Sequence, residues 1–98
     1  MIRVILPQHL RSLAGIEGEL QLDLSGPVTV LAVLEQIEIQ FPVLKGTIRE
    51  PQHKRRRAFV RFFACQEDLS DCPTSTVLPP PVLSGEEPFM IIGAMAGG

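Results

Sequence analysis

Two short segments near the N-terminus have the hydrophobic pattern of β-strands. Residues 2–6 are rich in β-branched and apolar side chains, and the run stops at Pro7, which cannot donate to a central sheet ladder. Residues 19–24 alternate strictly between polar and apolar, as in a strand with one buried face. The two segments therefore predict an antiparallel pair, joined by a loop through Gly15 and Gly18.

Residues 30–41 have the spacing of an amphipathic helix. Apolar side chains recur at intervals of four, three and four residues, at Val30, Leu34, Ile37 and Phe41. Thr29 is placed to cap the first turn, and Pro42 prevents the helix from continuing. The side chains expected on the solvent side are Glu35, Glu38 and Gln40.

The next segments predict a polar loop followed by a third strand. Residues 46–57 are polar and contain the basic run 53–57. Two interpretations stay open for Lys54 to Arg57: a solvated loop, or a docking site for an acidic partner. Residues 58–65 alternate as a strand. One face of this strand carries Val60, Phe62 and Ala64, and the other carries Phe59, Arg61 and Phe63.

The C-terminal third is rich in turn-forming residues until a final strand. Residues 66–85 include three consecutive prolines, Pro79 to Pro81, and leave room only for a short strand at 76–78. The last strand is expected at residues 89–92.

The order of these elements predicts an α+β roll, in which a mixed sheet of four to five strands carries one main helix on one face. One helix can cover only one face, so the other face meets water or a partner. Exposed apolar patches mark interaction surfaces. Because side chains alternate along a strand, the sequence indicates which residues of the third and last strands face outward. The residues expected to bind a partner are Arg61, Phe63, Met90 and Ile92.

Composition narrows the class of protein. The 98 residues suffice for one compact domain, and 45% hydrophobic against 20% charged residues predicts a folded chain. A net charge of −2 argues against a general nucleic-acid binder. The sequence has no apolar run long enough to span a membrane and no signal-peptide pattern, so we expect a cytoplasmic protein.

The sequence holds no convincing catalytic or metal-binding motif. Cys65 and Cys72, with His9 and His53 distant in sequence, have neither zinc-site spacing nor a CxxC pattern. We expect two free thiols, no metal site and no catalytic side chain.

The informative chemistry lies in the pair Gly97-Gly98. Glycine has no Cβ, so such a pair can pass through a narrow channel that a side chain would block. Gly98 also presents its α-carboxylate without a shielding group, which suits a carboxylate that an enzyme must bring to ATP. The alternative is a frayed, flexible tail.

The chain resembles the ubiquitin-like β-grasp sulfur carriers of the ThiS/MoaD family. Its ending Ala94-Met95-Ala96-Gly97-Gly98 carries the specific part of this resemblance. Further matches are Leu10-Arg11, Pro42 with Leu44, Phe59-Val60-Arg61-Phe62, Glu67-Asp68 and Ser84-Gly85-Glu86-Glu87. Two features depart from the family: Cys65-Gln66 replaces its usual Asn-Gly turn, and three prolines are inserted.

The resemblance implies a protein cosubstrate rather than an enzyme. Residues 1–92 would form the β-grasp domain and 93–98 a flexible tail. A ubiquitin-activating-type enzyme would adenylate Gly98, with Gly97 and Ala96 threading its channel, and sulfur would then give a thiocarboxylate. No cofactor is bound, because the partner enzyme uses the ATP.

The implied partners are that adenylating enzyme and a sulfurtransferase or acceptor synthase, with no nucleic acid and no membrane. The sulfur would serve molybdopterin, thiamine or cysteine biosynthesis. Two alternatives stay open: a ubiquitin-like modifier conjugated through Gly98, and a non-catalytic interaction module.

Overall fold

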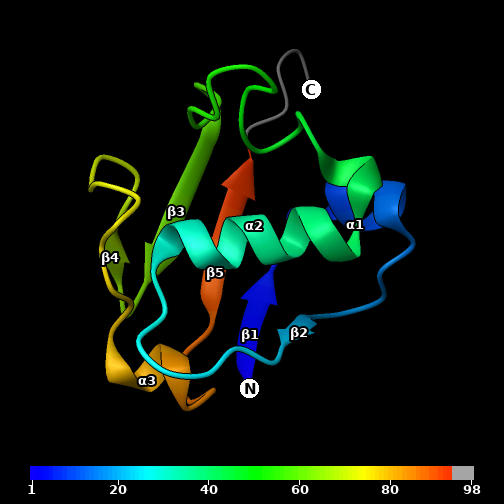
Figure 1. Cartoon of the computed structure of the whole chain (residues 1–98). Helices are drawn as coiled ribbons and strands as arrows, with labels where there is room; N and C mark the ends of the chain where they lie inside the picture. The colour runs from blue at the N-terminus through cyan, green and yellow to red at the C-terminus, as the bar shows by residue number, and fades with distance from the viewer. Residues whose placement is uncertain (94–98) are drawn as a thin grey trace.

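A five-stranded mixed sheet crossed by one long helix organises residues 1–93, the part of the chain that the computed structural model describes (Figure 1). The strands are β1 Ile2–Ile5, β2 Leu20–Leu22, β3 Val60–Ala64, β4 Glu67–Asp68 and β5 Phe89–Gly93. The helices are α1 Gln8–Ala14, α2 Val30–Gln40, the 3-10 helix η1 Pro42–Leu44 and α3 Pro80–Leu83. The predicted fold class, α+β with one main helix, is confirmed.

The last strand lies in the middle of the sheet, whose order is β2-β1-β5-β3-β4. β1 pairs antiparallel with β2, as predicted, and parallel with β5, where Val4 is opposite Phe89. β5 also pairs antiparallel with β3 over four residue pairs. Strand β5 is therefore held between two strands.

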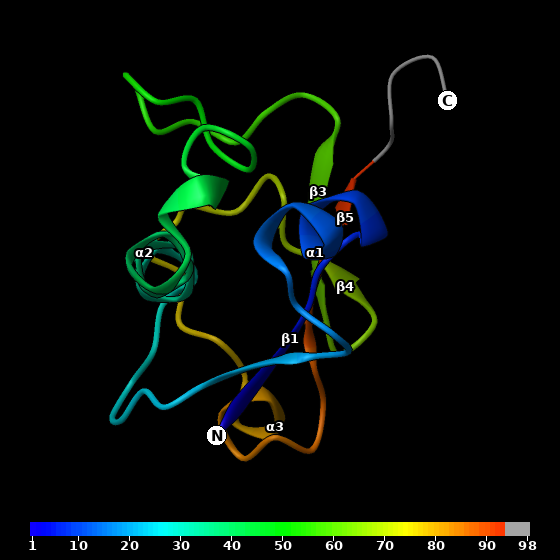
Figure 2. The same ribbon diagram turned by 90° about the vertical axis from the view of Figure 1, so that its right-hand side faces the viewer.

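Helix α2 covers one face of the sheet, as its spacing predicts. The Thr29 hydroxyl accepts a hydrogen bond from the Ala32 N–H at 3.1 Å, and the helix ends at Gln40, one residue earlier than predicted, just before η1. Seen along its axis, α2 lies on one side of the strands (Figure 2). The rings of Phe62 and Phe89 lie 5.7 Å apart within this buried layer.

Glu38 was predicted to face solvent, and that prediction is wrong. Its side chain is only 7% exposed and accepts two hydrogen bonds from Arg49, at 2.8 and 3.0 Å. These bonds lower the pKa of Glu38 against the opposing effect of burial. The pair ties the 46–57 loop to α2 and places two charges inside the fold with both partners satisfied.

The predicted loop after β1 is instead a helix, α1. Leu10 anchors it in the core, and Gly15, with φ +70°, ends it in the left-handed conformation. The following Ile16 N–H donates to the Arg11 carbonyl at 2.9 Å, which closes the helix end. The Leu-Arg-Ser-Leu-Ala run before Gly15 is the signal for this helix.

The segment between β3 and β5 also differs from its prediction. The strand expected at 76–78 is reduced to a single bridge, Thr29 with Val77. Instead β4 pairs with β3 through a two-residue turn in which Cys65 and Gln66 both have positive φ. The prolines open α3, which lies near the start of β1 at one end of the sheet (Figure 1).

No helix among residues 1–93 combines the length and the apolar character needed to cross a membrane.

We predict that Leu34→Ala destabilises the protein by about 2 to 5 kcal/mol, because Leu34 is buried between α2 and the sheet and its removal leaves a cavity. Ile39→Ala is the matched control on the same helix, since Ile39 is 68% exposed and should change stability by less than about 0.5 kcal/mol. Denaturant melts measure both. Equal losses for the two variants would contradict the assigned helix face.

Candidate functional site

Four side chains from β3 and β5 form a cluster on the face of the sheet opposite α2. Arg61 is opposite Ile92 and Phe63 is opposite Met90 in the antiparallel register. Ile92 is 43% exposed, and the other three are half-buried. The predicted outward placement of all four is confirmed, whereas their role in partner binding stays a prediction. We call these four residues the outer-face cluster.

A shallow groove of about 290 Å³ adjoins the cluster at the turn between β3 and β4. It is lined by Phe63, Ala64, Cys65, Gln66, Glu87, Pro88, Met90 and Ile92. Most of this lining is apolar, and Glu87 supplies the one carboxylate. Such a surface suits an apolar side chain of a partner protein.

A hydrogen-bonded ion pair fixes the polar member of the cluster. Arg61 donates to Asp68 from two nitrogens, at 2.6 and 3.1 Å, and lies 3.7 Å from Asp71. The Ser70 hydroxyl, Arg61 and the Ser70 backbone N–H all donate to Asp68, and they lower its pKa to about 2. Asp68 is therefore ionised at neutral pH and holds the guanidinium toward β4.

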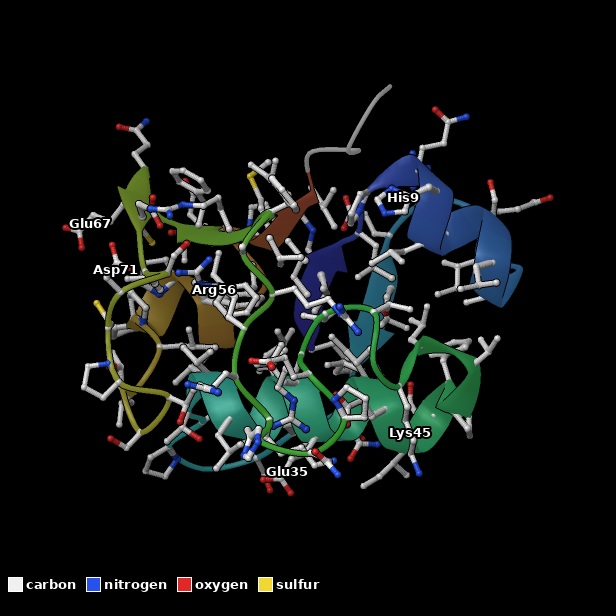
Figure 3. The ribbon with its side chains drawn as sticks, turned by 90° about the horizontal axis from the view of Figure 1, so that it is seen from above. His9, Glu35, Lys45, Arg56, Glu67 and Asp71 are labelled. Carbon is white, nitrogen blue, oxygen red and sulfur yellow. The ribbon has the colours of Figure 1, made fainter. Side chains whose placement is uncertain are left out.

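Residue Gly93 is the last residue of β5 and of the described part of the chain. It is opposite Val60, the first residue of β3. A Cβ at Gly93 would lie 3.2 Å from Cε1 of His9 and 3.3 Å from Cγ of Pro7, so the backbone passes close to α1 (His9 is labelled in Figure 3). No local pattern indicates this approach, because residues 9 and 93 are brought together only by the β1–β5 pairing.

Residues Ala96, Gly97 and Gly98 lie outside the described part of the chain. The threading of the first two and the adenylation of the third stay predictions. Within residues 1–93, no group of His, Cys, Asp and Glu side chains is arranged to hold a metal ion. Cys65, beside the groove, and Cys72, on the surface, are free thiols.

The sequence missed two features of the site. The first is the ion pair between Asp68 and Arg61. Asp68 was noted only because Glu67-Asp68 matches the family, and the ion pair depends on the β3–β4 hairpin, which was not predicted. The groove depends on the same hairpin, since Cys65 and Gln66 form its turn. The position of Cys65-Gln66, where the family has an Asn-Gly turn, is the signal that could have located both.

The described fold is that of the ubiquitin-like β-grasp proteins, which confirms the fold expected from the resemblance. No protein-family model and no curated protein sequence matches the chain.

Solved structures match over the full length. SAMP1 from Haloferax volcanii has a TM-score of 0.75 and 16% identity, over 98% of this chain and 97% of that one. A chain of the BexX/CysO complex of Amycolatopsis orientalis has a TM-score of 0.73 and 20% identity, over the whole of both chains. CysO of Mycobacterium tuberculosis has a TM-score of 0.72 and 21% identity, over 97% of this chain and 100% of that one. At these identities the likeness establishes the fold.

We predict that Asp68 contributes a pH-dependent part of the protein's stability. Its folded pKa of about 2 is below the ordinary 3.8, so folding favours the ionised form and the contribution is present above about pH 4. It is lost as the pH falls toward 2. Thermal melts of wild type and Asp68→Asn should therefore differ at neutral pH and converge across this range.

Asp23→Asn, which removes another exposed carboxylate, is the control for the general effect of charge. A difference between wild type and Asp68→Asn that stays constant from pH 7 to about pH 2 would contradict the ion-pair assignment.

Proposed function

We propose that this chain is a sulfur carrier protein whose Gly98 carboxylate is adenylated and then converted to a thiocarboxylate. The observation that carries the proposal is the β-grasp fold in combination with Gly97-Gly98. In this fold the last strand, β5, contributes to an exposed apolar face, and in the sequence Gly97 and Gly98 follow its final residue, Gly93, by four and five positions. The chain itself acts as a cosubstrate, and the adenylating enzyme supplies the catalytic groups.

The first step uses the terminal carboxylate as the nucleophile. A carboxylate oxygen of Gly98 attacks the α-phosphorus of Mg-ATP, the bond from this phosphorus to the bridging oxygen breaks, and pyrophosphate leaves. The product is an acyl adenylate, a mixed anhydride with an electrophilic carbonyl carbon. Holding the reacting atoms about 3 to 3.5 Å apart accounts for much of the rate, so the position of the carboxylate must be set closely.

The second step replaces AMP with sulfur. Hydrosulfide attacks the acyl carbon, AMP leaves with the electrons of the C–O bond, and loss of one proton gives the thiocarboxylate. A persulfide would instead give an acyl disulfide, which a second thiol cleaves to release the thiocarboxylate and a disulfide. The thiocarboxylate is a soft nucleophile that a sulfurtransferase or acceptor synthase can use.

The outer-face cluster is the proposed docking site for the adenylating enzyme. Five residues follow Gly93 and can span at most about 18 Å, so the enzyme must bind the folded domain close to the end of β5. Phe63, Met90 and Ile92 offer apolar area there, and Arg61 offers a fixed cation. Exposed apolar clusters of this kind mark interaction surfaces.

One solved structure of the same fold supports a protein partner. The Amycolatopsis orientalis structure is a complex of CysO with a second protein, BexX. The proposed acceptor here is a cytoplasmic synthase of molybdopterin, thiamine or cysteine biosynthesis, and genes beside that of this protein would identify which one.

The second candidate function is a ubiquitin-like modifier, in which an isopeptide bond joins Gly98 to a lysine. The Haloferax volcanii relative is named a small archaeal modifier protein, which favours this alternative. Both functions begin with adenylation of Gly98.

The proposal predicts that deleting Gly98, or adding one alanine after it, abolishes adenylation. One residue moves the carboxylate by up to about 3.6 Å, which takes it out of reach of the α-phosphorus. The ATP–pyrophosphate exchange rate with the ubiquitin-activating-type enzyme of the same organism measures this step. Variants that exchange as fast as wild type would exclude both the carrier and the modifier, and leave the non-catalytic interaction module.

Phe63→Asp separates docking from chemistry in the same assay. It should raise the KM for the carrier about tenfold or more, because a charge in the apolar cluster opposes binding, and leave the rate at saturation largely unchanged. Val43→Asp is the matched control, because Val43 is an exposed apolar residue of η1 outside the cluster. An equal KM for both variants would place the docking site elsewhere.

A further inference from the structure

A second surface feature lies beside the first residue of β3 and shares only Arg61 with the outer-face cluster. It is a hollow of about 570 Å³. Its lining residues are Glu50, Arg56, Arg57, Ala58, Phe59 and Arg61. Three of these six residues carry guanidinium groups and one carries a carboxylate. We call this feature the cationic hollow.

The guanidinium groups of the cationic hollow are held in place by the protein. Arg56 donates to the Val60 carbonyl at 2.6 Å and to the Ser70 carbonyl at 3.2 Å, with Asp71 at 3.4 Å. Arg57 donates from Nε to the Gly46 carbonyl, and Arg61 is held by Asp68. Side chains fixed in this way lose little conformational freedom on binding.

The charge of the hollow is only partly compensated. Arg57 has no carboxylate within ion-pair distance among residues 1–93, and the neighbouring Lys54 is exposed and lies 3.9 Å from Glu38, whose carboxylate already binds Arg49. This cationic surface belongs to a chain whose net charge is −2. The positive charge is therefore local and stands out from the rest of the molecule.

An exposed aromatic ring lies among these cations. Phe59 is 61% exposed, although a ring of this size is normally buried. Aromatic and arginine side chains are enriched in protein interfaces and dominate their binding energy. The combination favours a partner segment that carries acidic groups together with an apolar side chain.

The hollow is continuous with the outer-face cluster and lies near Gly93, the last described residue of β5. Arg61 belongs to both surfaces. Phe59 directly precedes Val60, which is opposite Gly93 in the register. An enzyme that receives the residues after Gly93 must therefore pass close to the hollow.

We propose that the cationic hollow binds an acidic segment of the adenylating enzyme, at the rim of the channel that receives Gly98. The inference rests on the proposed function and extends it to a second contact. A protein segment fits better than a nucleic acid, because Glu50, Asp68 and Asp71 border the hollow and would repel a continuous phosphate backbone.

Equilibrium binding of the adenylating enzyme to the full chain tests this inference. At about 50 mM salt, Arg57→Glu should weaken binding about tenfold, and the loss should shrink at about 500 mM salt because exposed charges are screened. Phe59→Ala should weaken binding about fivefold at both salt concentrations, since its contribution is apolar. Phe59→Ala is included because Arg57→Glu also removes the hydrogen bond that Arg57 donates to the Gly46 carbonyl within the 46–57 loop. The Phe59 ring is exposed, so its removal tests the surface without changing a contact inside the loop.

Lys45→Glu is the matched control. It makes the same charge change at an exposed lysine next to η1, away from Arg56 in the view of Figure 3, and should change the Kd by less than about twofold. Thermal melts check that all variants are folded. If wild type binds the enzyme tightly and both Arg57→Glu and Phe59→Ala bind it with the Kd of wild type, the inference is overturned. The proposed function would then still stand.

Two further outcomes would also overturn it. A loss of affinity for bulk transfer RNA in Arg57→Glu, with enzyme binding unchanged, would identify a nucleic-acid surface instead. Absence of enzyme binding by wild type would overturn the proposed function together with the inference.

Discussion

The position of β5 between β1 and β3 determines which side chains the outer face of the sheet presents. Because a strand alternates its side chains, β5 contributes Phe89 and Ile91 to the core and Met90 and Ile92 to the outer surface. The parallel pairing with β1 and the antiparallel pairing with β3 fix this strand from both sides. One long helix covers only one face, so the outer side chains remain available next to the end of the strand. The same arrangement that stabilises the core therefore leaves the outer-face cluster, the proposed docking surface, beside the end of β5.

The buried pair of Glu38 and Arg49 extends this organisation to the 46–57 loop. Charges inside a fold are tolerated when both partners are hydrogen-bonded, and here two bonds join the carboxylate to the guanidinium. The loop is thereby attached to α2 before it delivers Arg56 and Arg57 to the start of β3. Removing one partner alone would leave an unpaired buried charge, so the loop depends on both. In this way a core interaction supports the cationic hollow on the surface.

The sequence predicted the parts of the structure that depend on local periodicity. Intervals of three and four residues located α2, and alternation assigned Arg61 and Phe63 to the outer face. Prediction from the sequence failed where a contact joins distant segments. Helical spacing assigned Glu38 to the solvent side and did not indicate its buried hydrogen bond to Arg49, which lies in a later loop. Prediction also failed at the turn of Cys65 and Gln66, because both adopt positive φ without being the Asn and Gly that such turns prefer. Missing that turn meant missing β4, and with it the ion pair and groove of the candidate site.

The mass of the C-terminal peptide of this protein, isolated from cells, shows most directly whether Gly98 carries sulfur as proposed. We expect a fraction of peptide in which sulfur replaces one oxygen of the Gly98 carboxylate, and this fraction should disappear when the adenylating enzyme is deleted. A peptide joined through Gly98 to a lysine, with no sulfur-bearing form, would contradict the carrier and identify a modifier. An unmodified carboxylate in cells with and without the enzyme would contradict both.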